Sequence, residues 1–451
     1  MSGAIAIFTL LTVLVLLLGA TRRPGWALAA VITMLPIEQV LQSTMPVFLR
    51  TPWLYNALVA LTCFGCLATK PIRGRSYQLL VSGPVFMAMA VITLALLSLI
   101  WSPQIDPVDR ILRESVPPFV VAILIIPAII DSLDDLRDAA QATIVTGIVC
   151  ALGVLLNPAA KNVWGRLALD MGTHTGNFLC MSEMGGTMVI LAVLIRWPGT
   201  TGLVLRASAA LLGAALFFST GSRGQVIFAG ALSLAFYPLA HAIRNVSSFF
   251  LNATLLSALG GLAMLGASLF VQQGSARRWD LAGRDFLLRI EFVQSLLGKW
   301  GATPSAWFSG LGLGSFYAYG FGGDYVHNTY VEALGEVGLI AFVLLVLVTA
   351  FGIAGLLRLF RTCSSNPWDR NDLALLMALT AYQLLLSFKQ GSLLGANLLI
   401  MFLLIGFRLP RVMAVAEPDG FEEAEDEAGD PTDDEGDGSG WDHDAPPATK
   451  A

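Results

Sequence analysis

The sequence predicts an all-α integral membrane protein, a polytopic helix bundle of about 12 to 13 transmembrane helices with one large external loop containing short amphipathic helices. Of its 451 residues, 55% are hydrophobic and 13% are charged, which is about half the charged fraction of an ordinary soluble domain. The mean hydropathy is +0.70. Apolar runs of roughly 17 to 25 residues, the length that crosses a bilayer, recur along the chain, and one long polar gap (272–336) interrupts them.

The apolar runs define the predicted helices. They lie, in chain order, at 3–20, 25–41, 53–68, 79–101, 116–130, 139–156, 178–197, 203–219, 226–242, 249–271, 337–357, 373–388 and 393–407. The run 25–41 carries Glu38 and is broken by Pro36. We therefore predict four segments, namely a bundle of about ten helices (1–272), a large external loop (273–336), a three-helix membrane segment (337–408) and a disordered acidic tail (409–451).

The charges predict the orientation of the chain in the membrane. Residues 417–451 hold 14 of the 32 acidic residues and one of the 27 basic ones, so the rest of the chain has a net charge of +8. Such an acidic segment cannot bury enough apolar surface to fold, and we expect a disordered, solubilising tail. Alternate short loops carry fourteen Lys and Arg on one side and seven on the other. The positive-inside bias then places the first set and the tail in the cytoplasm and the large loop outside.

Three arginines predicted on the external side are candidates for binding an anion. Arg223 lies in STGSRG (219–224), a turn between two apolar runs in which Thr220 or Ser222 can cap the next helix. Arg166 precedes the run 178–197, and Arg289 lies in the large loop. A guanidinium can hold a phosphate through paired hydrogen bonds. The alternative is that each arginine only extends to lipid phosphates.

Two further motifs lie in the large loop. Residues 284–300 read RDFLLRIEFVQSLLGKW, whose apolar residues recur at helical spacing and predict an amphipathic helix on the membrane or bundle surface. Gly310, Gly312 and Gly314 follow in a GLGLG sequence. No βαβ pattern surrounds these glycines, so we favour close backbone packing over nucleotide binding.

His327 is the candidate catalytic residue. It precedes the run 337–357 by a distance that places it near the level of the lipid phosphates. Thr329 and Glu332 match a T-x-x-E capping box, which predicts a helix starting just after His327 and gives Asn328, Thr329 and Glu332 a structural role. An imidazole is suited to removing a proton from a hydroxyl near neutral pH. A hydrogen-bonded interfacial histidine is the alternative.

The sequence predicts no metal site. The external loops contain no DxD motif, and Asp106 and Asp109 are their only close acidic pair, without further ligands nearby. Cys63 and Cys66 lie in an apolar run, where we expect them to pack as buried thiols.

Several of these motifs together are similar to those of a known family. His327 and Asn328 are followed, after nine residues, by Gly338. RIEF starts at Arg289, SGLGLGSF starts at Ser309, SRG occupies 222–224, and WGRLALDMGTHTGN (164–177) is a looser match. In this combination, over roughly 163–405, the chain resembles the bacterial O-antigen ligase and O-antigen polymerase family of C-type membrane glycosyltransferases.

The resemblance implies an enzyme of the bacterial inner membrane with its active site on the periplasmic face. Members transfer an undecaprenyl-diphosphate-linked glycan, with inversion and without cofactor or metal, to a glycan or lipid-core acceptor in lipopolysaccharide, capsule or exopolysaccharide synthesis. Carried over, Arg223 and Arg289 would hold the diphosphate, with Arg166 a weaker candidate, and His327 would act on the acceptor hydroxyl. The resemblance leaves polymerase and ligase open. It implies membrane lipids and no nucleic acid as partners.

Two other classes of function remain as alternatives. A secondary transporter or flippase of a polar solute would carry paired ionisable residues within the spans, where only Glu38 and Glu183 are found. A scaffold of a polysaccharide-assembly machine would use the acidic tail to bind other assembly proteins.

Overall fold

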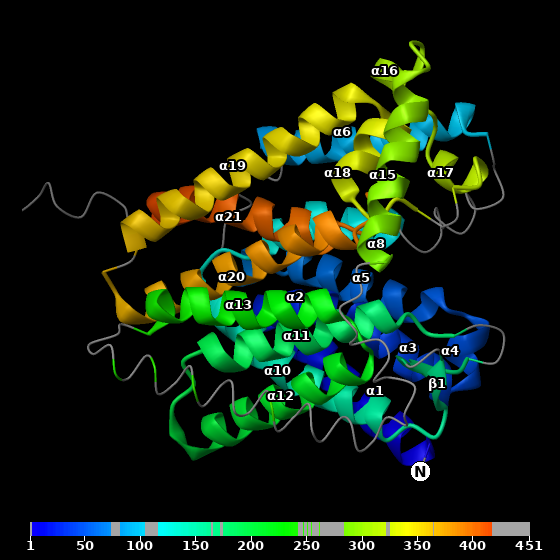
Figure 1. Cartoon of the computed structure of the whole chain (residues 1–451). Helices are drawn as coiled ribbons and strands as arrows, with labels where there is room; N and C mark the ends of the chain where they lie inside the picture. The colour runs from blue at the N-terminus through cyan, green and yellow to red at the C-terminus, as the bar shows by residue number, and fades with distance from the viewer. Residues whose placement is uncertain are drawn as a thin grey trace, which may run out of the picture. The chain divides into compact units, whose positions relative to one another are not determined.

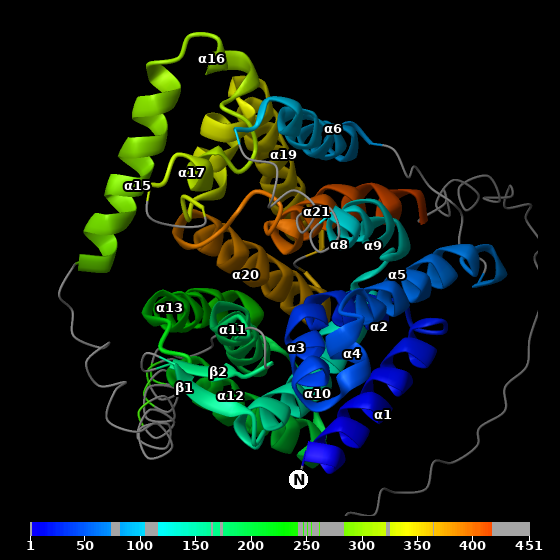
Figure 2. The same ribbon diagram turned by 90° about the vertical axis from the view of Figure 1, so that its right-hand side faces the viewer.

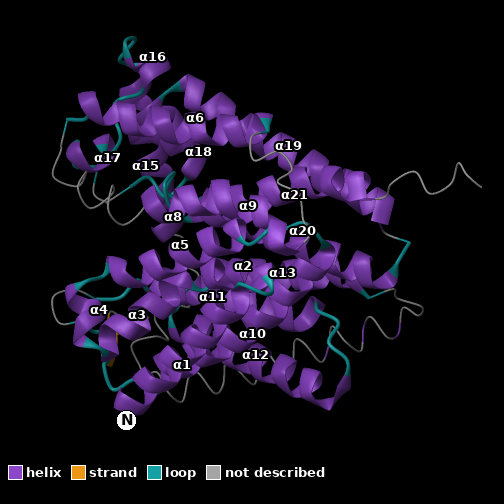
Figure 3. Cartoon of the chain, turned by 180° about the vertical axis from the view of Figure 1, so that it is seen from behind, coloured by secondary structure: helices purple, strands orange, loops and turns teal. Residues whose placement is uncertain are grey.

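The computed structural model describes residues 2–73, 82–103, 116–163, 166–171, 175–241, 284–321, 325–363 and 365–416, and four single positions between 247 and 261. Most of these residues are helical (Figure 3), which confirms the predicted fold class. Through Met413 the chain forms one compact unit, and 414–451 is a second unit.

The elements before the large loop are mostly long helices. They are α1 (Ser2–Ala20), α2 (Pro24–Ile32), α3 (Met34–Thr44), α4 (Pro46–Arg50), α5 (Trp53–Ala68), the 3-10 turn η1 (Pro71–Arg73), α6 (Gly83–Ser98), the 3-10 turn η2 (Leu99–Trp101), α8 (Val116–Val120), the π-helical turn η3 (Val121–Ile125), α9 (Ile126–Ile129), α10 (Leu133–Leu155), the strands β1 (Ala160–Val163) and β2 (Arg166–Leu169), α11 (Phe178–Leu194), α12 (Gly199–Ser219) and α13 (Arg223–Ala240).

The remaining elements form the large loop and the C-terminal helices. They are α15 (Arg284–Gly301), α16 (Ala306–Ser309), α17 (Ser315–Ala318), α18 (Thr329–Glu332), the π-helical turn η5 (Ala333–Val337), α19 (Leu339–Cys363), α20 (Pro367–Lys389) and α21 (Asn397–Ala416).

By length and composition, seven helices in the described part of the chain can cross a membrane, or eight if the bent pair α2 and α3 counts as one span. Three shorter apolar stretches lie at Trp53–Ala68, Val116–Ile129 and Phe178–Leu194. The protein is therefore a multi-pass membrane protein. Most of the predicted span 249–271 lies outside the described residues, and each of the other predicted spans coincides with a helix or broken helix.

The predicted break in the second span lies just before Pro36. Helices α2 and α3 meet at an angle of 64°. Pro36 is the third residue of α3, and in a continuous helix its ring would collide with the carbonyl of Ile32, where α2 ends. The helix accordingly stops one turn ahead of the proline.

Helices from both halves of the chain share one core. Seen in Figure 1, helices α10, α11, α13, α19, α20 and α21 run in similar directions, and α15 crosses them. Figure 2 shows α20 between a group with α11 and α13 and a group with α19 and α6. The buried residues around α20, including Leu373, Leu379 and Tyr382, belong to the same cluster as those of α2, α10 and α11.

Two details differ from expectation. Helix α21 continues to Ala416 with Pro410 inside it, so the predicted start of the disordered tail at residue 409 is wrong. Residues 417–451 lie outside the described residues. In addition, β1 and β2 form an antiparallel hairpin that pairs Ala160 with Leu169 and Val163 with Arg166, an element that an all-helical prediction does not contain.

Candidate functional site

The three predicted arginines lie within electrostatic range of Lys389, the last residue of α20. The positive charges of Arg289, Arg166 and Arg223 all act on the Lys389 ammonium. These residues come from α15, β2, α13 and α20. We call Arg166, Arg223, Arg289 and Lys389 the cation cluster. The sequence alone gave no reason to assign Lys389 a role.

The SRG turn holds the Lys389 side chain. Lys389 Nζ donates hydrogen bonds to Ser222 Oγ at 3.1 Å and to Gln390 Oε1 at 3.3 Å. A Cβ atom on Gly224 would lie 2.4 Å from Lys389 Cε, so the glycine makes room for the lysine stem. Ser222 precedes α13 without capping it through its side chain, and Thr220 Oγ1 donates to Leu216 O. The predicted capping role of these two residues is therefore wrong.

Arg289 joins the large loop to the end of α20. Its guanidinium Nη1 donates to the backbone carbonyl of Lys389. The predicted helix 284–300 is confirmed as α15. One turn after Arg289, Phe292 is buried with its ring edge-on to Phe316, at 5.3 Å between ring centres. Leu287, by contrast, is 58% exposed. The buried face of α15 therefore fixes the position from which Arg289 reaches α20.

Arg166 is positioned by the β-hairpin and by an aromatic ring. It is the first residue of β2, and its guanidinium carbon lies 4.1 Å from the centre of the Phe178 ring. The negative face of an aromatic ring attracts a cation and holds a planar guanidinium in one orientation. Phe178 begins α11, so the hairpin is tied to the bundle at the point where Arg166 meets the cation cluster.

His327 lies in a turn with a left-handed backbone. Its φ of 61° is the only positive value for a non-glycine residue in the described part of the chain, a conformation that costs roughly 1 to 2 kcal/mol for most side chains. Its ring centre lies 4.3 Å from that of Tyr325 and 6.4 Å from that of Phe292. The two aromatic rings thus fix the position of the imidazole.

The residue after His327 connects this turn to α20. Asn328 Nδ2 donates to the carbonyl of Phe388 at 3.4 Å, and the next carbonyl, that of Lys389, accepts from Arg289. Neighbouring carbonyls at the end of α20 therefore receive one donor from the His327 turn and one from α15. This places the turn that carries His327 beside the end of α20, where Lys389 lies.

Asn328 also caps α18, which starts just after His327 as predicted. Its Oδ1 accepts from the backbone N–H groups of Tyr330 and Val331, both at 3.1 Å. The predicted T-x-x-E capping box is wrong, because Thr329 Oγ1 donates to Ser392 O and Glu332 Oε1 accepts from Leu393 N. Both side chains tie α18 to the segment after α20. Hydrogen bonds to the backbone of Ser392 and Leu393 thus take the place of the bonds expected within the capping box.

A buried acidic pair follows on the same turn. Glu336 accepts from Gly314 N at 2.7 Å and from Phe316 N at 2.8 Å, which anchors the glycine sequence. Burial raises the pKa of Glu336 to about 7. Burial, and then the charge of Glu336, raise the pKa of Glu332 well above its usual value of 4.5.

The glycine sequence packs against η5, as predicted. Leu311 N donates to Gly335 O at 2.9 Å and Gly312 N to Glu336 O at 2.8 Å. Gly310 has φ of 73°, and a Cβ there would lie 2.1 Å from the carbonyl oxygen of Glu336. Backbone approach this close requires glycine.

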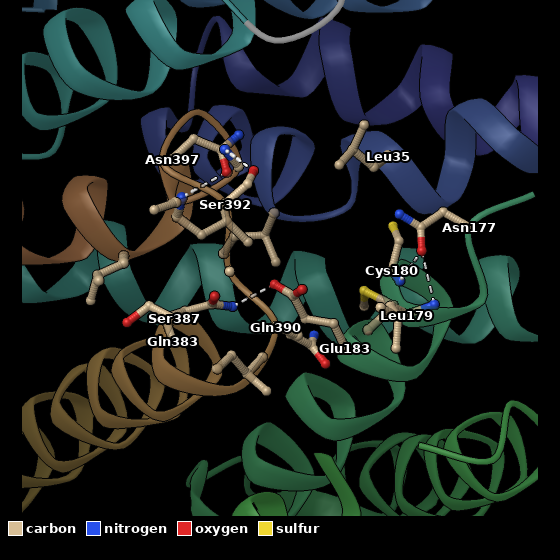
Figure 4. A pocket seen from close by; sticks show the side chains of 18 of the residues that line it. Leu35, Asn177, Leu179, Cys180, Glu183, Gln383, Ser387, Gln390, Ser392 and Asn397 are labelled. Carbon is tan, nitrogen blue, oxygen red and sulfur yellow. Dashed lines mark hydrogen bonds between the residues drawn. The ribbon is translucent and has the colours of Figure 1, made fainter. Parts of the chain in front are cut away.

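A cavity of about 180 Å³ lies next to the His327 turn. Its lining includes Tyr325, two positions before His327, and Thr329, two positions after it. Elsewhere in its lining, Gln383 Nε2 donates to Glu183 Oε1 at 2.7 Å (Figure 4). The sequence flagged Glu183 as an ionisable residue within a span but not its partner, which is 200 positions away.

No group of three or more metal-ligating side chains comes together in the part of the chain that the structure describes. Asp106 and Asp109 lie outside the described residues. Metal independence therefore stays a prediction. Cys63 and Cys66 are buried and form no disulfide, and Cys66 Sγ donates to Ala20 O at 3.1 Å, which confirms that they pack inside the bundle.

Comparison with known proteins finds no match, either to a protein family or to a curated protein sequence.

Proposed function

We propose that this protein is a membrane glycosyltransferase that transfers a glycan from an undecaprenyl-diphosphate carrier to a sugar hydroxyl, as members of the O-antigen ligase and polymerase family do. The observation that carries the proposal is the convergence of Arg166, Arg223, Arg289 and Lys389 beside His327. The reaction is expected on the outer face of the bacterial inner membrane.

The cation cluster suits a diphosphate leaving group. Departure of the diphosphate from the sugar anomeric carbon leaves negative charge on the phosphate oxygens. Fixed guanidinium and ammonium groups stabilise such charge most where little water screens it. Arg166 is held by Phe178 and Lys389 by Ser222, so these groups require little rearrangement when the charge develops.

His327 suits the other half of the reaction. In inversion, the acceptor hydroxyl attacks the anomeric carbon on the face opposite to the diphosphate, and its proton must leave. A histidine with a pKa near 6.5 removes such a proton effectively at neutral pH. The Tyr325 and Phe292 rings would keep the imidazole in place, with general acid–base catalysis contributing about 10² to 10⁴-fold.

The test is a set of alanine substitutions in the full-length protein. We expect His327→Ala, Arg289→Ala and Arg223→Ala to remove most transfer of lipid-linked glycan, measured by product chain length and by attachment to the lipid acceptor. Leu287→Ala, on the exposed side of α15, serves as the control. Normal product from all three variants would rule the proposal out.

The same assay separates the two forms of the reaction. Loss of a polymerase leaves single repeat units on the acceptor, whereas loss of a ligase leaves lipid-linked polymer that is not attached. The acidic tail is a further discriminator, because removing 417–451 should leave an enzyme largely active and should inactivate a scaffold.

A second candidate function is transport of a polar solute across the membrane. The partly buried Glu183 and Gln383 pair beside a cavity favours it, since ionisable groups inside spans mark transport pathways. Solute uptake by the reconstituted protein that survives His327→Ala would support the transporter over the enzyme.

A further inference from the structure

The cavity beside His327 differs in chemistry from the cation cluster. Its described lining contains four side-chain amides, one carboxyl group and several hydroxyls but no lysine, arginine or histidine. The amides and the carboxyl group belong to Asn177, Glu183, Gln383, Gln390 and Asn397. Gln390 follows Lys389 directly, and its Oε1 accepts from Lys389 Nζ at 3.3 Å, so the two sites meet at the end of α20. One is cationic, and the other is polar without positive charge.

We propose that this cavity is a binding subsite for a neutral sugar ring, separate from the diphosphate-binding cations. The inference rests on the proposed glycosyltransferase function, and it assigns the polar lining of Glu183 and Gln383 to recognition of sugar hydroxyls.

The hydrogen-bonding groups that line the cavity suit a sugar. Each sugar hydroxyl both donates and accepts, and an amide side chain offers an acceptor oxygen and two donor hydrogens. The Glu183 carboxylate adds an acceptor, and its partner Gln383 orients it (Figure 4). Leu35, Leu179 and Leu398 line other parts of the cavity and can cover the apolar C–H face of a pyranose.

Size and position fit as well. About 180 Å³ is smaller than the roughly 300 to 1,000 Å³ of pockets for drug-sized ligands, so the cavity admits one sugar residue rather than an oligosaccharide. Tyr325 and Thr329 line it on either side of His327. A ring bound here would lie next to the His327 turn, at the lining residues Tyr325 and Thr329, while the rest of the glycan remained outside.

Cys180 provides a direct reporter of occupancy. It lines the cavity and is partly exposed, and among the other four cysteines only Cys363 is not buried. In a Cys363→Ser protein in lipid nanodiscs without glycoside detergent, N-ethylmaleimide should therefore label Cys180. We expect octyl β-glucoside, below its micellar concentration, to slow this labelling at least fivefold and saturably. Octan-1-ol and inorganic pyrophosphate should change it by less than twofold.

Variants of the lining test the assignment. We expect Gln383→Leu and Glu183→Gln each to raise the half-protecting glucoside concentration about tenfold, because the first removes an amide from the lining and the second replaces one acceptor oxygen with a donor NH₂ group. Asn397→Ser provides an independent change should either variant fold poorly. Thr380→Val is the matched control on α20, because the Thr380 hydroxyl donates to Leu376 O and does not line the cavity.

The outcomes separate this inference from the proposed function. Absence of protection by octyl β-glucoside, equal protection by octan-1-ol, or an unchanged half-protecting concentration in both lining variants would overturn the sugar subsite. Protection should persist in His327→Ala, which does not line the cavity. If His327→Ala also retained glycan transfer, the proposed catalytic role would fail while the sugar subsite remained.

Discussion

Lys389 Nζ donates a 3.1 Å hydrogen bond to Ser222 Oγ across 167 positions of the chain. This bond joins the end of α20 to the SRG turn and sets the lysine among three arginines. The SRG turn therefore carries one positive charge, on Arg223, and holds a second one, on Lys389, through the Ser222 hydroxyl.

Gly224→Ala tests whether the position of the Lys389 side chain matters for activity. The new methyl group would meet the flexible end of the Lys389 side chain at 2.4 to 2.9 Å, so the lysine would move at little cost to folding. We expect transfer activity to fall roughly tenfold or more, given how steeply rate depends on position, and the unfolding temperature to change little. Gly230→Ala in the same helix, with open space around its Cβ, should retain activity. Full activity in Gly224→Ala would argue against a role for the lysine position.

Gly310→Ala should be much more harmful to stability than Gly320→Ala. Both glycines have positive φ, 73° and 68°, but only at Gly310 would an added Cβ meet backbone, 2.1 Å from Glu336 O, whereas open space surrounds Gly320. Backbone strain alone costs roughly 1 to 3 kcal/mol, and the clash adds to it. Thermal unfolding of the purified variants measures the difference, and equal stabilities would show that the contact with η5 is dispensable.

The acidic pair predicts a stability that falls as pH rises. The pKa of Glu336 is raised to about 7, and that of Glu332 is raised well above 4.5, chiefly by burial. The folded protein therefore holds more protons than the unfolded chain above pH 4.5, so their contribution is complete below that pH and is lost as pH rises through about 7. We expect a lower unfolding temperature at pH 8 than at pH 5.5.

Glu332→Gln is the matched variant for the pH experiment. It keeps an acceptor for Leu393 N and removes one titrating group together with its repulsion of Glu336. The fall in unfolding temperature between pH 5.5 and 8 should be smaller in this variant. An identical pH profile in the two proteins would place the pH sensitivity elsewhere.

Substitutions of His327 can separate its ring from its backbone. Asn and Gly tolerate a φ of 61° better than Ala or Val. We expect His327→Asn to match the wild type in unfolding temperature and His327→Val to be destabilised by about 1 to 2 kcal/mol, while both lose transfer activity. Activity in His327→Asn would mean that the imidazole does no proton transfer.

The sequence was sufficient to predict most of the helices and the close backbone packing of the glycine segment, but not its partner, η5. Apolar length specifies a span regardless of its neighbours, and a single proline explains the break before Pro36. Local capping was less predictable. Thr329 and Glu332 match a capping box in sequence, yet Asn328 caps the helix while the other two bond to the segment after α20.

The partners across the bundle could not be predicted because they depend on which spans become neighbours. Glu183 was visible as an acid in an apolar run, but periodicity does not indicate that Gln383 faces it. Lys389 was visible as a cation at the end of a span, where contact with lipid explains a lysine equally well. The hydrogen bond from Lys389 to Ser222 could be predicted only by knowing that α13 packs against α20.

The cation cluster has a consequence for biosynthesis of the protein. Translation reaches Lys389 only after Arg166, Arg223 and Arg289. The backbone carbonyl of Lys389 accepts a hydrogen bond from Arg289, and its side chain donates one to Ser222. A chain that has been inserted only as far as α19 therefore lacks the segment on which the arginines converge. Anion affinity would then arise only when α20 enters the membrane, so a ribosome-bound or truncated chain would not capture lipid-linked substrate.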